Sequence, residues 1–168
     1  MLKPRLIIAE PRAQVAEELA THLKSHPRIT VQPCKLDQLN RAPDVDACYL
    51  SIMAAERWGA AFWGGGNLPP INEAQIFKTS DGDRNEGWPA YILAGVRLSG
   101  PEDVFNYPVC LRRIIGAIVR AVVDFNTKSQ DKIETVALDV GFTCIEKVEP
   151  QLAMKTIRDA YDREADSG

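Results

Sequence analysis

Apolar runs recur along the chain and predict about six strands. Each run is short and is bounded by proline, glycine or charged residues, as is typical of strands. The predicted strands are Arg5–Ala9, Ile29–Gln32, Val45–Ile52, Ala74–Thr79, Ala90–Leu98 and Thr135–Val140. The third, fifth and sixth of these are apolar along most of their length. That composition suits burial on both faces, so we expect these three at the centre of the sheet.

Helical spacing of apolar residues marks several of the intervening segments. Val109–Phe125 is the longest of them and is apolar on most sides, so we expect the rest of the fold to cover it. Met53–Phe62 predicts a short helix, and Pro150 opens a final amphipathic helix. We expect His26-Pro27 to close the first helix and residues 162–168 to form a loose tail. One face of that first helix presents Val15, Ala16, Leu19, Ala20 and Leu23.

Polar and glycine-rich segments predict the irregular connections. We expect a polar connection, with no helix in it, over residues 33–44, a loop at Ser80–Gly87 and a break in regular structure at Trp63–Pro70. Two starts fit the longest helix equally well. One is a Ser-x-x-Glu capping pattern at Ser99, and the other is Asn106 immediately before a Tyr-Pro pair.

Helices that alternate with apolar strands predict an α/β fold. We expect three α/β/α layers, with a mixed sheet of about six strands in the middle. The chain has 168 residues, and a domain typically holds roughly 100–200. The sequence has no internal repeat and no linker-like segment, so we expect residues 1–168 to form a single domain.

Composition and charge narrow the function classes. Hydrophobic residues make up 45% and charged residues 26%, which is typical of a folded globular chain. The net charge is −3, whereas a protein that grips nucleic-acid phosphates is usually basic, so we expect no nucleic-acid partner. No stretch approaches the roughly 18 apolar residues of a membrane span. The apolar run near the start is too short for a signal peptide, so we expect no membrane association and a cytoplasmic location.

The cysteines and the missing motifs argue against several kinds of chemistry. No CxxC pair and no nearby histidine accompanies the cysteines, so we expect free thiols in a reducing cytosol and no structural metal. The motifs GxxxxGK[ST], GxGxxG, GxSxG and HExxH are absent, and we expect no cofactor. The four widely spaced cysteines are Cys34, Cys48, Cys110 and Cys144.

Two loops are candidates for ligand binding. The run Gly64–Gly66 allows backbone N–H groups to approach a phosphate, although it suits a flexible turn equally. The loop Gly141–Cys144 follows a buried strand, where open α/β sheets tend to bind ligands. Its Cys144 is either a reactive thiol or an inert small hydrophobe. The aromatic residues beside the glycine run either wall a pocket or pack in the core: Trp58, Phe62 and Trp63.

Several segments, taken in order, carry a resemblance to a known family. VDACYLSIM is similar to that family's central strand, and INEAQIFKTSDGD to its next strand and turn. AYILAGVRLSGPED is similar to the strand before the long helix, and ETVALDVGFTCIEKVEPQLAMKTIRDAYDR to the last strand, phosphate loop and final helix. From about Arg5 to Arg163 the chain resembles the macro domain family, whose members commonly bind ADP-ribose. The resemblance implies a macro-domain-like three-layer fold with a ligand pocket.

Some positions depart from that family's pattern. Lys35 stands where the family has an adenine-recognising aspartate, and Met53 where it has an asparagine that contacts the distal ribose. An ammonium cannot accept a hydrogen bond from adenine, so we expect weak selectivity for adenine and a preference for anionic groups. The resemblance implies ligand contacts at Lys35, Met53, Trp63, Gly64, Gly65, Gly66, Asn67, Gly141, Phe142, Thr143 and Cys144.

Three functions remain open from the sequence. The first is a divergent, non-catalytic macro-like module that binds a phosphorylated nucleoside or an ADP-ribose-related metabolite. The second is a scaffold or interaction protein whose pocket has decayed. The third is a hydrolase acting on ADP-ribose esters, against which Met53 and Phe142 argue, because they replace groups that would hold the distal ribose and the diphosphate. We favour the first, with a small-molecule partner and no catalytic residue, and make no prediction of oligomeric state.

Overall fold

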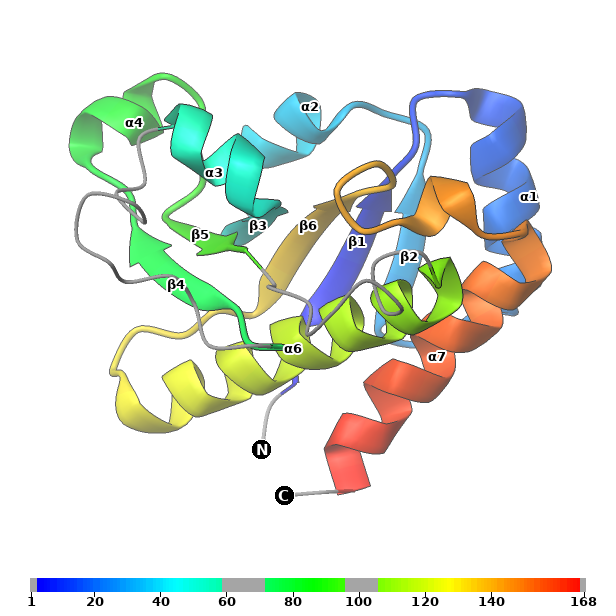
Figure 1. Cartoon of the computed structure of the whole chain (residues 1–168). Coiled ribbons are helices and arrows are strands. Elements are labelled where there is room, and N and C mark those ends of the chain that lie inside the picture. Colours follow the sequence, from blue (N-terminus) through cyan, green and yellow to red (C-terminus); the bar gives the residue numbers. More distant parts are fainter. Residues whose placement is uncertain (1–2, 59–71, 96–105, 167–168) are drawn as a thin grey trace.

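A mixed sheet lies at the centre of the protein, with helices on both of its faces (Figure 1). The computed structural model describes residues 3–58, 72–95 and 106–166. Within these ranges the sheet has six strands in the order β2-β1-β6-β3-β5-β4. They are β1 (Arg5–Ala9), β2 (Ile29–Gln32), β3 (Ala47–Leu50), β4 (Gln75–Lys78), β5 (Tyr91–Ala94) and β6 (Thr135–Asp139). The expected α/β fold with a six-stranded mixed sheet is confirmed.

The strand directions bring five carboxyl ends to the same end of the sheet. Strands β2, β1, β6, β3 and β5 are parallel, and only β4 among the described strands is antiparallel, to β5. The three runs expected at the centre became β3, β5 and β6, and none of them lies at an edge. The carboxyl ends of β1, β6, β3 and β5 therefore adjoin one another, which is where parallel sheets usually bind ligands.

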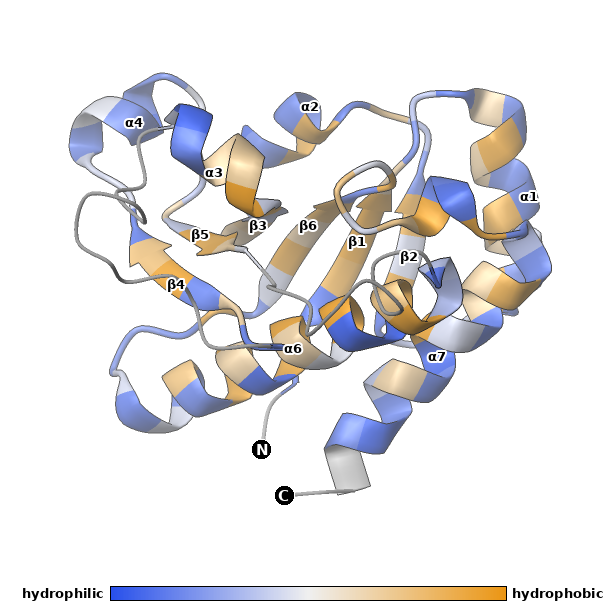
Figure 2. Ribbon diagram, viewed as in Figure 1, coloured by the Kyte–Doolittle hydropathy of each residue, from blue (hydrophilic) through white to orange (hydrophobic). Residues whose placement is uncertain are grey.

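Two hydrophobic clusters fill the space between the sheet and the helices. Leu6 and Ile8 of β1 pack into the cluster under the helices α1 (Ala13–Leu23), α6 (Tyr107–Lys128) and α7 (Pro150–Asp166). Ala9 packs into the cluster under α2 (Leu36–Asn40) and α3 (Ile52–Trp58). This alternation follows the period of two along a strand, and Figure 2 shows the apolar strands at the centre of the fold. The helices are α1 (Ala13–Leu23), α2 (Leu36–Asn40), α3 (Ile52–Trp58), α4 (Asp81–Asn85), α6 (Tyr107–Lys128) and α7 (Pro150–Asp166), with a short 3-10 turn η1 (Ile145–Lys147).

Helix α6 is the longest described element and is covered on most sides, as expected. Asn106 precedes it and caps it, because its Oδ1 accepts a hydrogen bond from the Val109 N–H at 3.4 Å. The alternative start at Ser99 lies outside the described residues. Nine of the helix residues are buried: Cys110, Leu111, Ile114, Ile115, Gly116, Ala117, Ile118, Val119 and Val122.

Three expectations about the connections were wrong. Helix α1 ends at Leu23, before His26-Pro27, because Lys24 and Ser25 adopt left-handed φ angles of 58° and 54°. The expected polar connection at residues 33–44 contains α2, and the expected loop at residues 80–87 contains α4. In α4 the Ser80 hydroxyl accepts from the Asp83 N–H while the Asp83 carboxylate accepts from the Ser80 N–H, a reciprocal cap that stabilises a short helix.

The chain end is also more ordered than expected. Helix α7 continues to Asp166, so a loose tail from residue 162 is wrong for all but residues 167–168, which lie outside the described ranges. Contacts hold this last part of the helix to the fold. Asp162 pairs with His26 at 3.1 Å, and Glu164 pairs with Arg120 at 2.5 Å. No helix in the described residues is long and apolar enough to cross a membrane.

Candidate functional site

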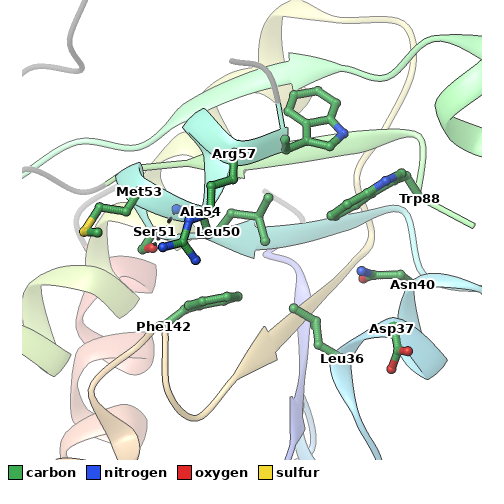
Figure 3. Close-up of a pocket in the computed structure, with 11 residues that line it drawn as sticks. Leu36, Asp37, Asn40, Leu50, Ser51, Met53, Ala54, Arg57, Trp88 and Phe142 are labelled. Atoms are coloured by element: carbon green, nitrogen blue, oxygen red, sulfur yellow. Dashed lines mark hydrogen bonds between the residues drawn. The ribbon is translucent and has the colours of Figure 1, made fainter. Parts of the chain in front are cut away.

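A cavity of about 630 Å³ lies beyond the carboxyl end of β3. Helix α2 forms one side, helix α3 another, and the loop after β6 a third. This volume is within the usual range for a small-molecule site, roughly 300–1,000 Å³. Its lining residues are Leu36, Asp37, Asn40, Leu50, Ser51, Met53, Ala54, Arg57, Trp58, Trp88 and Phe142 (Figure 3).

Apolar and aromatic side chains form most of the cavity wall. Phe142 and Leu36 approach from below in Figure 3, and Trp88 enters from the opposite side. The rings of Trp58 and Trp88 are 6.0 Å apart and tilted by 58°. Phe142 also packs against both hydrophobic clusters, so the core fixes its position. The wall therefore suits a flat, apolar group such as an aromatic base.

The Asn40 amide is the most informative polar group in this cavity. Asn40 is 8% exposed, and its side chain points into the cavity in Figure 3. Its Oδ1 has no hydrogen-bond partner among the described residues. The Asn40 amide also forms a hydrogen bond with the Cys48 thiol. Burial raises the pKa of that thiol to about 12, and the hydrogen bond from Asn40 only partly opposes this rise. A buried acceptor without a partner destabilises the fold. This oxygen is almost fully inaccessible, so the Asn40 side chain would have to rotate slightly for a ligand donor to reach it.

Helix α3 supplies the cavity's hydrogen-bond donors. Ser51 precedes the helix, and its Oγ accepts from the Ala54 N–H at 3.2 Å, so the hydroxyl serves as a cap. Arg57 is exposed, and in Figure 3 its guanidinium extends toward Phe142. The buried Nε1 of Trp58 has no partner within the described ranges. The cavity thus has an acceptor on α2 and donors on α3.

The loop after β6 has a different role from the one expected of a phosphate loop. The Asp139 carboxylate accepts hydrogen bonds from the backbone N–H groups of Gly141, at 3.1 Å, and Phe142. The Asp139 pKa is raised, mainly because the carboxyl group is buried. The negative charges of Glu146 and Glu10 raise this pKa further, whereas the two backbone hydrogen bonds lower it. The N–H groups that could cradle a phosphate therefore already hold a carboxylate of this chain.

An ion pair lies at the carboxyl end of the neighbouring strand β1. Glu10 is 1% exposed and pairs with Arg12, with 2.8 Å between Oε1 and Nε. The hydrogen bonds from Arg12 keep the Glu10 pKa below its ordinary value, although burial opposes them. The described residues hold no group of three His, Cys, Asp or Glu side chains that could bind a metal ion.

The structure brings only part of the predicted set to the cavity. Met53 and Phe142 line it. Lys35 does not; it is the exposed residue before α2, while Asp37, two positions later, lies on the cavity rim. The expectation of weak adenine selectivity depended on Lys35 facing the ligand, so it loses its basis. Gly141, Thr143 and Cys144 are in the adjacent loop but outside the lining, and Trp63, Gly64, Gly65, Gly66 and Asn67 lie outside the described residues.

Sequence reasoning missed several lining residues. Asn40 and Leu36 belong to a helix that the sequence did not predict, and Trp88 follows another. Trp58 had been left open between a pocket wall and core packing; it lines the cavity and also packs against the second hydrophobic cluster. A Leu-x-x-Leu-Asn pattern at residues 36–40 was the one signal that could have located α2. Nothing in it shows that Asn40 faces a cavity.

Comparison with known proteins identifies no family for this chain. A scan against models of protein families found no match, and a search of the curated proteins found no significant match. Any function must therefore be derived from the geometry and chemistry of the cavity itself.

Proposed function

We propose that the protein is a macro-domain-like, non-catalytic module that binds a phosphorylated adenosine in the cavity between α2, α3 and the loop after β6. One observation carries the proposal. The buried Asn40 amide, whose Oδ1 has no partner in the described part of the chain, lies in the wall of an aromatic-lined cavity of nucleotide size. The ordered resemblance of the sequence segments supports the same class of ligand.

The base would lie between Phe142 and the tryptophans. Its exocyclic amine would donate to the Asn40 Oδ1, and the Asp37 carboxylate at the rim would accept a second hydrogen bond. Both groups are acceptors, so they match the amine of adenine and oppose the carbonyl oxygen of hypoxanthine. A site built for an N–H group discriminates strongly against an analogue without it, because its acceptors then stay unpaired. Adenine is therefore the expected base.

The phosphate would be bound by Arg57 rather than by the loop after β6. The guanidinium is the charged donor that lines the cavity, and it forms strong hydrogen bonds with phosphate oxygens. A diphosphate that continued toward the β6 loop would have to displace the Asp139 carboxylate and face Glu146 and Glu10. We therefore expect a nucleoside monophosphate to bind at least as tightly as ADP-ribose.

A binding role fits the polar residues of the cavity better than hydrolysis does. None of the described lining residues is a histidine, and Ser51 uses its hydroxyl as a helix cap. Met53 is 67% exposed and offers only a weakly accepting thioether. These residues provide no nucleophile beside a general base, which covalent hydrolysis requires.

Calorimetric titration with a matched set of ligands tests this proposal. The probes are AMP, IMP, adenosine, ADP-ribose and inorganic phosphate, with quenching of tryptophan fluorescence as an independent signal. We expect AMP to bind about tenfold more tightly than IMP, which is about 1.4 kcal/mol. Asn40→Ala should weaken AMP binding by roughly three- to tenfold, the worth of one hydrogen bond.

Exposed residues elsewhere supply the controls. Asn85→Ala at the end of α4 and Arg112→Gln on α6 lie outside this cavity and should bind AMP as the unmodified protein does. Equal affinity for AMP and IMP would contradict the role of Asn40 and Asp37. No binding of any probe would overturn the proposed function and favour a scaffold protein.

A further inference from the structure

Two cysteine side chains that are far apart in the sequence meet next to the cavity. Cys110 lies in the first turns of α6, and Cys144 ends the loop between β6 and η1, 34 positions later. Their Sγ atoms are 2.9 Å apart, and neither side chain is part of a disulfide. Nothing in the sequence spacing indicated this pair.

The backbone on both sides of the pair is held by the fold. Cys110 is 4% exposed and belongs to the main hydrophobic cluster, and its N–H donates to the Asn106 carbonyl at 2.9 Å. Cys144 has a left-handed φ of 66°, and its carbonyl accepts from the Lys147 N–H at 3.0 Å. Since the two sulfur atoms already touch, a covalent bond needs only a small displacement.

We propose that Cys110 and Cys144 are a redox couple that forms a reversible disulfide when a hydroperoxide oxidises it. The disulfide would join α6 to the loop that carries Phe142. The couple is a modification site beside the cavity, and its formation does not depend on the proposed ligand.

The two thiols have different roles in this oxidation. Cys144 is only half-buried, so a small peroxide reaches it more easily than Cys110. The hydrogen bond from the Cys110 thiol lowers the Cys144 pKa, and Lys147 assists, against burial and the Glu146 charge. A larger thiolate fraction makes Cys144 the nucleophile.

The reaction balances in two steps. The Cys144 thiolate attacks the terminal peroxide oxygen, so an S–O bond forms and the O–O bond breaks. The leaving group is hydroxide from hydrogen peroxide, or an alkoxide from an organic hydroperoxide. The Cys144 sulfur is now a sulfenic acid. The Cys110 sulfur then attacks it, the S–S bond forms, the S–O bond breaks and the oxygen leaves as water with the proton of Cys110. The peroxide takes two electrons, and a dithiol reductant reverses the change.

The disulfide would restrict a wall of the cavity. Phe142 is two residues from Cys144 in a short loop, and a bond to α6 would fix that loop at a second point. We expect slower amide hydrogen exchange over residues 141–146 after oxidation. A disulfide closing a chain segment of this length should also raise the midpoint of thermal unfolding by roughly 5 °C.

Intact-mass spectrometry of the full chain tests the couple. The reduced protein is treated with a few equivalents of hydrogen peroxide, then denatured and alkylated. We expect a loss of 2 Da, two alkylated thiols instead of four, and a cross-linked peptide pair containing residues 110 and 144. Dithiothreitol should restore all four thiols.

Variants separate the two roles. Cys110→Ala should leave a Cys144 sulfenic acid that dimedone traps, and Cys144→Ser should form no intramolecular bridge. Cys34→Ser and Cys48→Ser are the matched controls and should still lose two thiols. Four alkylated thiols after peroxide, or a bridge that persists in Cys144→Ser, would overturn the proposal. Cys110→Ser serves if Cys110→Ala does not fold, with the same trapping expected.

Discussion

Replacing Asn40 with leucine should stabilise the protein and weaken ligand binding. Asn40 is 8% exposed, and its Oδ1 has no partner among the described residues. A buried polar atom without a hydrogen bond costs about 1–3 kcal/mol. Leucine has a similar size and removes that atom, so Asn40→Leu should recover part of this cost. Among the described residues, the loss is the weak hydrogen bond between the amide and the Cys48 thiol, about 0.5–1 kcal/mol.

The net effect should be a gain of about 1 kcal/mol in the free energy of unfolding. For a chain of this size that is about 2–4 °C in the midpoint of thermal unfolding. Urea denaturation followed by tryptophan fluorescence measures it as a higher midpoint concentration at an unchanged slope. In the same samples a fixed concentration of AMP should raise the unfolding midpoint less than it does in the unmodified protein.

Asn126 on α6 provides a matched control for this substitution. Its Nδ2 donates to the Ile133 carbonyl at 2.9 Å, and its Oδ1 accepts from the Ile133 N–H at 2.8 Å. Asn126→Leu would leave both backbone groups unpaired, so it should destabilise the protein by about 2–3 kcal/mol. If Asn40→Leu were as destabilising as Asn126→Leu, the Asn40 oxygen would have a structural role. The reasoning about the cavity would then be refuted.

Three further substitutions have defined outcomes. Asp139→Asn should stabilise the protein increasingly as the pH rises. Burial raises the Asp139 pKa, so folding favours the protonated carboxyl group. The buried charge therefore destabilises the fold only above the ordinary carboxyl pKa, and asparagine removes that charge. Thermal unfolding at a series of pH values between about 4 and 7 would show the gap widening, and a constant gap would contradict this. Tyr161→Phe should cost about 1 kcal/mol in urea denaturation, because the Tyr161 hydroxyl donates to the buried Pro4 carbonyl at 2.8 Å; an unchanged midpoint would contradict it. Phe142→Ala should cost about 2 kcal/mol and weaken AMP binding roughly three- to tenfold in calorimetry, since Phe142 packs on both clusters and lines the cavity; intact affinity would exclude stacking.

The sheet could be predicted from the sequence because its signal is repeated and strong. Residues 5–9 and 29–32 became β1 and β2 with the expected bounds. The strand expected from Val45 to Ile52 is shorter, since Ile52 already begins α3. A strand that is buried on both faces requires a continuous run of apolar residues, and such runs are rich in Val, Ile and Leu. The most continuously apolar runs are the ones that require neighbours on both sides, and they lie inside the sheet as β6, β3 and β5.

The two short helices could not be predicted in the same way. Helix α4 depends on the reciprocal hydrogen bonds of Ser80 and Asp83, in a segment whose Asp, Gly and Asn residues equally suit a loop. Helix α2 begins after Lys35, where the Gln38 side chain accepts from the Lys35 N–H at 2.9 Å. Five residues are too few for hydrophobic periodicity to appear. Because α2 carries Asn40 and Asp37, missing this helix also meant missing one side of the cavity.

A single side chain at the end of β6 changes what the adjacent loop can bind. Gly141 and the position of the loop predicted a phosphate cradle, and the backbone N–H groups of Gly141 and Phe142 do converge on an anion. That anion is the Asp139 carboxylate of the same chain, which a pattern of glycines cannot reveal. Under the proposed function, a charged ligand would therefore be recognised on the other side of Phe142, where Arg57 lines the cavity. Moving the anion-binding group from the β6 loop to α3 would be a physical reason for a monophosphate, rather than a diphosphate, to be the better ligand.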